Sequence, residues 1–63
     1  MTKKQVERYV LLSGVIGPML RHHITPDAQD MNEYMELWAV IFEEYMNNPE
    51  QFEESMREWG FSG

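Results

Sequence analysis

Apolar residues recur at helical spacing along the first third of the chain. At about 100° per residue they share one stripe that leaves the charged residues outside it. The members of this stripe are Val6, Tyr9, Leu12, Ile16, Met19 and Leu20. Thr2 and Gln5 have the spacing of a capping box, so we expect a helix over residues 3–22. Pro18 lacks an amide hydrogen and crowds the carbonyl of Gly14, which predicts that this helix is kinked or broken near Gly14–Pro18.

The clearest amphipathic pattern follows in the middle of the chain. Its apolar stripe consists of Met31, Tyr34, Trp38, Ile41, Phe42 and Tyr45, widened at the edges by Met35 and Leu37. The opposite side is expected to carry Glu33, Glu36, Glu43 and Glu44. We therefore predict a helix over residues 27–47, which Thr25 can cap, with Pro26 suited to its first position and Asp27 favourable at the positive end of the helix dipole. Asp30 with Glu33 offers a second possible start.

A shorter helix is expected over residues 49–59. Asn48 suits the cap and Pro49 the first helical position, while Gly60 is placed to end the helix. Its apolar face carries Phe52, Met56 and Trp59, with Phe61 able to fold back on Met56. No strand pattern competes with these helices. The expected fold is one all-α domain of three helices over residues 1–63.

The apolar run from Val10 to Leu20 raises the question of a membrane anchor or a secretion signal. It is shorter than the roughly 20 apolar residues that a membrane span needs. A signal peptide is disfavoured because Glu7 lies in the basic start, Arg21 follows the run directly, and no small-residue cleavage site appears. The chain has no cysteine, which fits a reducing compartment. We expect a cytoplasmic protein without a membrane partner.

Charge is distributed unevenly along the chain. The net charge is −6, but residues 1–26 are net +3 and residues 27–63 are net −9. The acidic part would repel nucleic-acid phosphates, and the basic part is too sparse to overcome that repulsion. Direct nucleic-acid binding is therefore not expected, whereas a partner protein with a basic surface is.

Candidate chemistry is sparse. His22 and His23 point about 100° apart on a helix, and no cysteine or further histidine completes a metal site. The many carboxylates fall on polar helix faces, and the serines have no base at a recognisable spacing. The chain is also small for a substrate pocket. We expect no enzymatic activity, no metal and no cofactor.

The aromatic and methionine content is more informative. A kinked helix and a short helix are not expected to cover the wide stripe of the middle helix, and Trp, Tyr and Met are enriched at protein interfaces. Surplus apolar surface predicts a partner, including a second copy of the chain in a homodimer. The residues expected in self-association are Tyr9, Val10, Leu11, Val15, Tyr34, Phe42 and Tyr45.

These observations lead to two main hypotheses. The first is a non-catalytic inhibitor or modulator that docks on a basic, nucleic-acid-binding protein, with carboxylates imitating phosphates; by analogy we expect a viral or mobile-element origin. Its partner-binding residues would be Glu33, Glu36, Trp38, Glu43, Glu44, Glu50, Glu54, Glu58 and Trp59. The second is a structural homo-oligomer or scaffold without an inhibitory role. Binding of the first helix to a membrane surface ranks last, because the acidic remainder opposes it.

Overall fold

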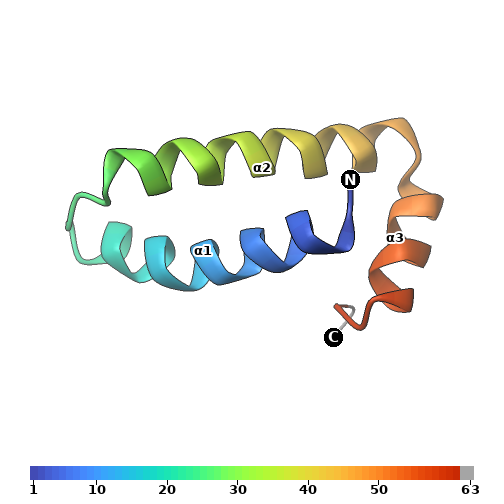
Figure 1. Ribbon diagram of the computed structural model, residues 1–63, viewed down its shortest axis with the longest axis horizontal. Coiled ribbons are helices and arrows are strands. Elements are labelled where there is room, and N and C mark those ends of the chain that lie inside the picture. The colour runs from blue at the N-terminus through green and yellow to red at the C-terminus, as the bar shows by residue number, and fades with distance from the viewer. Residues whose placement is uncertain (62–63) are drawn as a thin grey trace.

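Three helices make up the fold. The computed structural model describes residues 1–61 and contains α1 (Lys3–Arg21), α2 (Ala28–Asn47) and α3 (Pro49–Glu58), with no strand in that range. Helices α1 and α2 form an antiparallel hairpin, and α3 turns away across the far end of α2 (Figure 1). The prediction of an all-helical chain with three helices is confirmed.

Helix α1 begins with the predicted capping box. The Thr2 hydroxyl oxygen accepts a hydrogen bond from the Gln5 amide at 3.2 Å, and the Gln5 side-chain oxygen accepts one from the Thr2 amide at 2.8 Å. The helix then passes through Pro18 without interruption, so the expected break does not occur. Pro18 lies in the last turn and donates no hydrogen bond to the Gly14 carbonyl, and residue 14 is a glycine without a side chain to add to the crowding. A kink at this position stays a prediction.

The ends of α1 and α3 share one geometry. His23 follows α1 with a φ of 58°, and Gly60 follows α3 with a φ of 81°. In both cases the next amide reaches back to the helix: Ile24 donates to the Met19 carbonyl at 2.7 Å, and Phe61 donates to the Met56 carbonyl at 2.8 Å. These are Schellman motifs. The stop at Gly60 is confirmed, whereas the left-handed conformation of His23 is not what the sequence predicts.

Helix α2 begins later than predicted. Its cap is Asp27, whose carboxylate accepts a hydrogen bond from the Gln29 amide at 3.0 Å, and Pro26 precedes the helix. The prediction that Thr25 caps α2 is therefore wrong. Aspartate is the stronger capping residue, and its negative charge is favourable at the positive end of the helix dipole.

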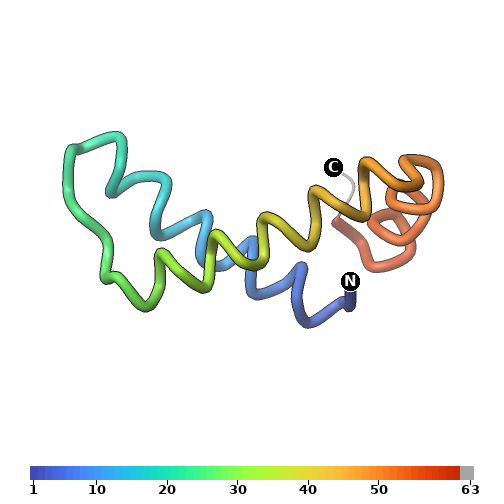
Figure 2. The backbone as a smooth tube through the Cα atoms, turned by 90° about the horizontal axis from the view of Figure 1, so that it is seen from above, coloured from blue at the N-terminus to red at the C-terminus, as the bar shows by residue number. Residues whose placement is uncertain are grey.

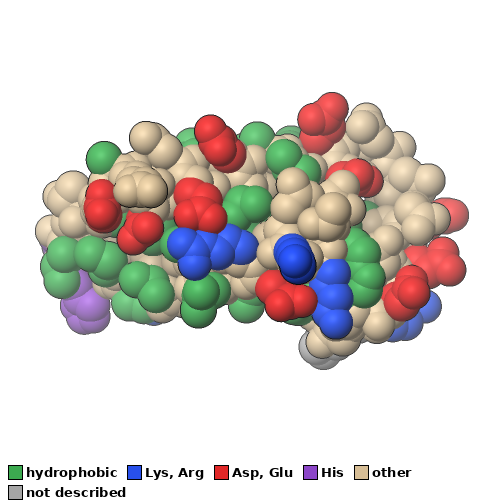
Figure 3. All heavy atoms as spheres, viewed as in Figure 1, with side chains coloured by type: hydrophobic (Ala, Val, Ile, Leu, Met, Phe, Trp, Pro, Cys, Tyr) green, Lys and Arg blue, Asp and Glu red, His purple; other side chains and the backbone are tan. Residues whose placement is uncertain are grey.

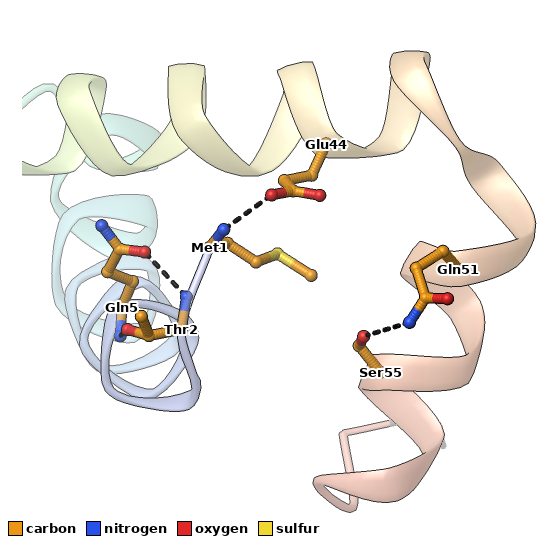
Figure 4. Close-up of polar contacts among 6 residues, drawn as sticks. All are labelled: Met1, Thr2, Gln5, Glu44, Gln51 and Ser55. Atoms are coloured by element: carbon orange, nitrogen blue, oxygen red, sulfur yellow. Dashed lines mark hydrogen bonds and ion pairs between the residues drawn. The ribbon is translucent and has the colours of Figure 1, made fainter.

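A single residue joins α2 to α3. The Asn48 amide donates to the Glu44 carbonyl and ends α2, while its side-chain oxygen accepts from the Gln51 amide at 3.2 Å and begins α3. Pro49 takes the first position of α3, as predicted. Figure 4 shows how α3 descends from this junction, with the Gln51 side chain donating to the Ser55 hydroxyl at 3.4 Å.

The buried core is thin. Among residues 1–61 only Val6, Leu12 and Ile16 are fully buried, at 1%, 4% and 1% exposure, and all three belong to α1. Helix α3 packs on α2 but makes no close backbone approach to α1. Leu20, predicted on the buried stripe, is half exposed. The two helices of the hairpin diverge toward their connecting turn (Figure 2), and Leu20 lies near that end.

Candidate protein-binding face

One side of α2 exposes large apolar side chains. Trp38, Phe42 and Tyr45 remain 45%, 46% and 44% exposed, and the flanking Met35 and Met46 are more exposed still. We call these five residues the aromatic face. The sequence places Trp38, Phe42 and Tyr45 in the stripe expected to be buried, but all three are exposed. Only the edge of that stripe with Ile41 and Leu37 lies on the more covered side. No residue of α2 is fully buried.

Aromatic rings pair within this face and connect it to α3. Trp38 stacks on Phe42 with ring centroids 5.0 Å apart, and Tyr45 meets Phe52 of α3 edge-on at 5.4 Å. Between these rings lies a shallow hollow of about 170 Å³, whose lining is Tyr9, Trp38, Ile41, Phe42, Tyr45 and Phe52. Small-molecule sites usually measure about 300–1,000 Å³. The hollow is therefore suited to a side chain of a partner protein rather than to a substrate.

The aromatic face is free of charge. At about 100° per residue, the charged positions of α2 leave an uninterrupted uncharged arc of about 220° between Asp30 and Glu43. A neighbouring helix covers a stripe of only about 100°. Helix α1 covers the adjoining side of α2, around Leu37 and the paired carboxylates of Glu33 and Glu44, and it reaches this arc only at the margin that carries Ile41. The aromatic face lies farther into the arc and stays open.

Two of the expected partner-binding acids are engaged within the chain. Glu33 accepts two hydrogen bonds from the Arg8 guanidinium, at 2.7 and 3.0 Å, and Glu44 accepts one from the Met1 amino group at 2.7 Å (Figure 4). The prediction that these two carboxylates lie on the side of α2 opposite its packing face is wrong. Both point toward α1, because a cation at the N-terminal end of the chain is within reach of each.

Pairing shifts the pKa values of both Arg8 and Glu33. Its hydrogen bonds and charge attraction lower the pKa of Glu33 below its usual value of 4.5 and raise the pKa of Arg8. Both groups lie at the surface, where water and salt weaken such pairs. The contact orients α1 against α2 without forming a reactive site.

The remaining expected partner-binding acids are free of ion pairs within residues 1–61. These residues are Glu36, Glu43, Glu50, Glu54 and Glu58, all exposed. Figure 3 shows the acidic side chains distributed over α2 and α3 on the face in view. On α2, Glu36 and Glu43 lie about 140–160° around the helix from Trp38. The structure therefore does not bring these acids and Trp38 onto one surface, and Trp59 is half-buried on α3.

The residues expected in self-association divide into three groups. Tyr9 and Tyr34 stack on each other within the chain, with centroids 5.2 Å apart and planes 6° from parallel. Phe42 and Tyr45 belong to the aromatic face. The third group, exposed on α1, comprises Val10, Leu11 and Val15.

Sequence reasoning did not include Met46 or Phe52 among the interface candidates. Met46 lies at the margin of the aromatic face, and Phe52 lines its hollow from α3. The signal that could have found Met46 is the wide uncharged arc, which ends only at Glu43. The position of Phe52 beside Tyr45 depends on the turn at Asn48, which the pattern within one helix does not reveal.

Metal sites and membrane spans were the other possibilities that the sequence raised. Residues 1–61 contain no group of three His, Cys, Asp or Glu side chains arranged to hold a metal ion. None of their helices combines the length and apolar character of a membrane span. Comparison with known protein families, curated proteins and solved structures finds no match for this chain.

Proposed function

We propose that this chain is a non-catalytic protein-binding module that acts as an inhibitor or modulator of a partner protein with a basic surface. The observation that supports the proposal is the coexistence of a half-exposed aromatic face and five exposed glutamates that form no ion pair within residues 1–61, on a chain of net charge −6. Aromatic residues dominate the binding energy of many protein interfaces. The lack of cysteine favours a reducing compartment such as the cytoplasm.

The acids and the aromatic face have different tasks in this proposal. The acids need not lie on the aromatic face to act, because charge attraction extends over about 8 Å at physiological salt and speeds the encounter with a basic partner. A row on α3 formed by Glu50, Glu54 and Glu58 repeats every four residues and presents its carboxylates along one side. A surface that recognises phosphates suits such a row, so we expect the partner to be a nucleic-acid-binding protein.

Affinity capture with charge-matched variants tests this function. The variant E50Q/E54Q/E58Q removes three charges, and the control E50D/E54D/E58D keeps them at the same positions. We expect the wild type and the control to retain a basic protein whose retention decreases as salt is raised, and the glutamine variant to retain much less of it. The purified partner should then lose or change its activity when the wild-type chain is added. Equal retention by all three chains, or no effect on the partner, would contradict the proposal.

A second candidate function is a homo-oligomeric scaffold. The specific observation in its favour is the aromatic face itself, which carries no charge with which to recognise a basic partner. The two functions are compatible, because self-association through the aromatic face leaves the outward acids accessible.

A further inference from the structure

The chain exposes more surface than a compact monomer of its size. Its accessible surface is 4865 Å² for a mass of 7.5 kDa. A typical monomer of that mass exposes about 4,250 Å², so the surplus is about 600 Å². The radius of gyration is likewise large, at 12.6 Å compared with about 10.6 Å for a compact chain of this length. A standard protein interface covers about 800 Å² on each partner, which is close to this surplus.

The described chain covers the aromatic face only in part. Helix α2 has 20 residues and is about 30 Å long, whereas α3 has 10 residues and is about 15 Å long. Helix α3 also turns across the end of α2 rather than running along it (Figure 1). It reaches Tyr45 through Phe52 but leaves Met35 and Trp38 open.

Charge indicates what kind of chain would cover this face. The glutamates that would attract a basic protein lie elsewhere around α2, and the uncharged arc offers such a partner no charge complementarity. The aromatic face of a second copy is equally uncharged and apolar, so the two faces match in polarity. We infer that a second copy of this chain covers the aromatic face in a two-fold, antiparallel homodimer. This inference rests on the proposed protein-binding function and names the occupant of its apolar surface.

Two-fold symmetry determines which residues of the two copies contact each other. In such an interface residue i of one copy contacts residue j of the other, and j contacts i. The aromatic face runs from Met35 to Met46, so its midpoint lies between Trp38 and Phe42. Trp38 of each copy then lies against Phe42 of the other, and Met35 lies against Met46. The aromatic pair at the centre is buried from both sides, as in the well-packed centres of stable interfaces.

Sedimentation equilibrium of the purified chain tests the inference without any other protein. We expect a mass near twice 7.5 kDa at high protein concentration. Each copy carries a charge of −6, so the copies repel one another at low salt. The dimer should therefore tighten when salt is raised from about 50 to about 500 mM, because the charges are screened while the uncharged seam is not weakened. Docking on a basic partner should respond to salt in the opposite direction.

Matched substitutions test whether the aromatic face forms the dimer interface. Phe42→Glu places a charge at its centre and should weaken the dimer about tenfold or more, while Leu11→Glu on α1, at 57% exposure, should leave it unchanged. Met35→Glu tests the same face without disturbing an aromatic pair, so it keeps the test valid if circular dichroism shows that Phe42→Glu does not fold.

Three results would overturn the inference: a 7.5 kDa monomer at every concentration and salt, a dimer that survives Met35→Glu, or a dimer lost through Leu11→Glu. None of them bears on capture of a basic partner through the α3 glutamates. Conversely, loss of that capture with an intact dimer would refute the proposed partner alone.

Discussion

The Arg8 guanidinium binds the Glu33 carboxylate through two hydrogen bonds, Nε to Oε2 at 2.7 Å and Nη2 to Oε1 at 3.0 Å. The two residues are 25 positions apart in the sequence and belong to the two arms of the hairpin. Paired nitrogens and oxygens of this kind fix orientation as well as distance. The pair therefore helps to set the register of α1 against α2.

Acid should weaken the fold through this pair. The pKa of Glu33 is lower in the folded chain than its usual value of 4.5, so its contribution to stability is present above that value and is lost as pH falls through the folded pKa. We expect urea unfolding to show a loss of stability below about pH 4.5 that is smaller in Glu33→Gln. Glu43→Gln, which removes an unpaired acid, is the matched control and should behave like the wild type.

Alkaline pH should destabilise the fold through the ionisation of Tyr9. Burial, assisted by the neighbouring Tyr34, raises the pKa of Tyr9 above its usual value of 10. A group whose folded pKa is raised stabilises the fold fully below its unfolded pKa and loses that effect as pH rises through the folded one. Stability should therefore decrease above about pH 10, and less so in Tyr9→Phe. The difference in ultraviolet absorbance between the wild type and Tyr9→Phe isolates Tyr9, which should ionise above pH 10; ionisation of Tyr9 at or below that pH would contradict this expectation.

Replacing His23 with glycine should stabilise the chain. His23 has the left-handed backbone conformation that a side chain disfavours, and its strain is about 1 kcal/mol. The gain is reduced by the extra freedom of glycine in the unfolded chain. Gly60→Ala is the complementary test, since an added Cβ meets no atom within 4 Å and any loss comes from backbone strain alone. Thermal unfolding should show a higher midpoint for His23→Gly and a lower one for Gly60→Ala.

Ile16 should be essential for the thin core. Its side chain is 1% exposed, and truncating a buried isoleucine to alanine costs about 2–5 kcal/mol. A domain of this size is stable by only about 3–9 kcal/mol, so Ile16→Ala should remove a large fraction of the free energy of unfolding and lower the urea midpoint markedly. Val15→Ala, one position away on the exposed side, should change stability by less than about 0.5 kcal/mol. Similar losses in both variants would refute this account of the core.

Helix-end chemistry was predictable from the sequence because it depends on residues only a few positions apart. The Thr2–Gln5 capping box, the Asn48–Pro49 restart and the stop at Gly60 all appear as expected. Asp27 shows the limit of this reasoning. Thr25 and Asp27, two positions apart, both have side chains that can cap a helix, and only the structure decides between them.

The sides that each helix turns toward its neighbours were less predictable. Glu33 and Glu44 look like solvated acids in the pattern of α2, because their partners at Arg8 and Met1 are distant in sequence. The stripe of α2 is also too wide to reveal which edge α1 covers. Leu37 turned out to lie on the more covered edge and Trp38 on the open one. That choice depends on how the two arms cross, which periodicity within one helix does not encode.

The single-residue junction at Asn48 limits how this chain tolerates insertions. One extra residue there would rotate α3 by about 100° about its own axis and carry Phe52 away from Tyr45. The segment from His22 to Asp27, which joins the arms of the hairpin, is longer and largely exposed, so insertions there leave both helices in place. Length variation among variants of this chain should therefore concentrate before α2 and be absent at the corner that follows it.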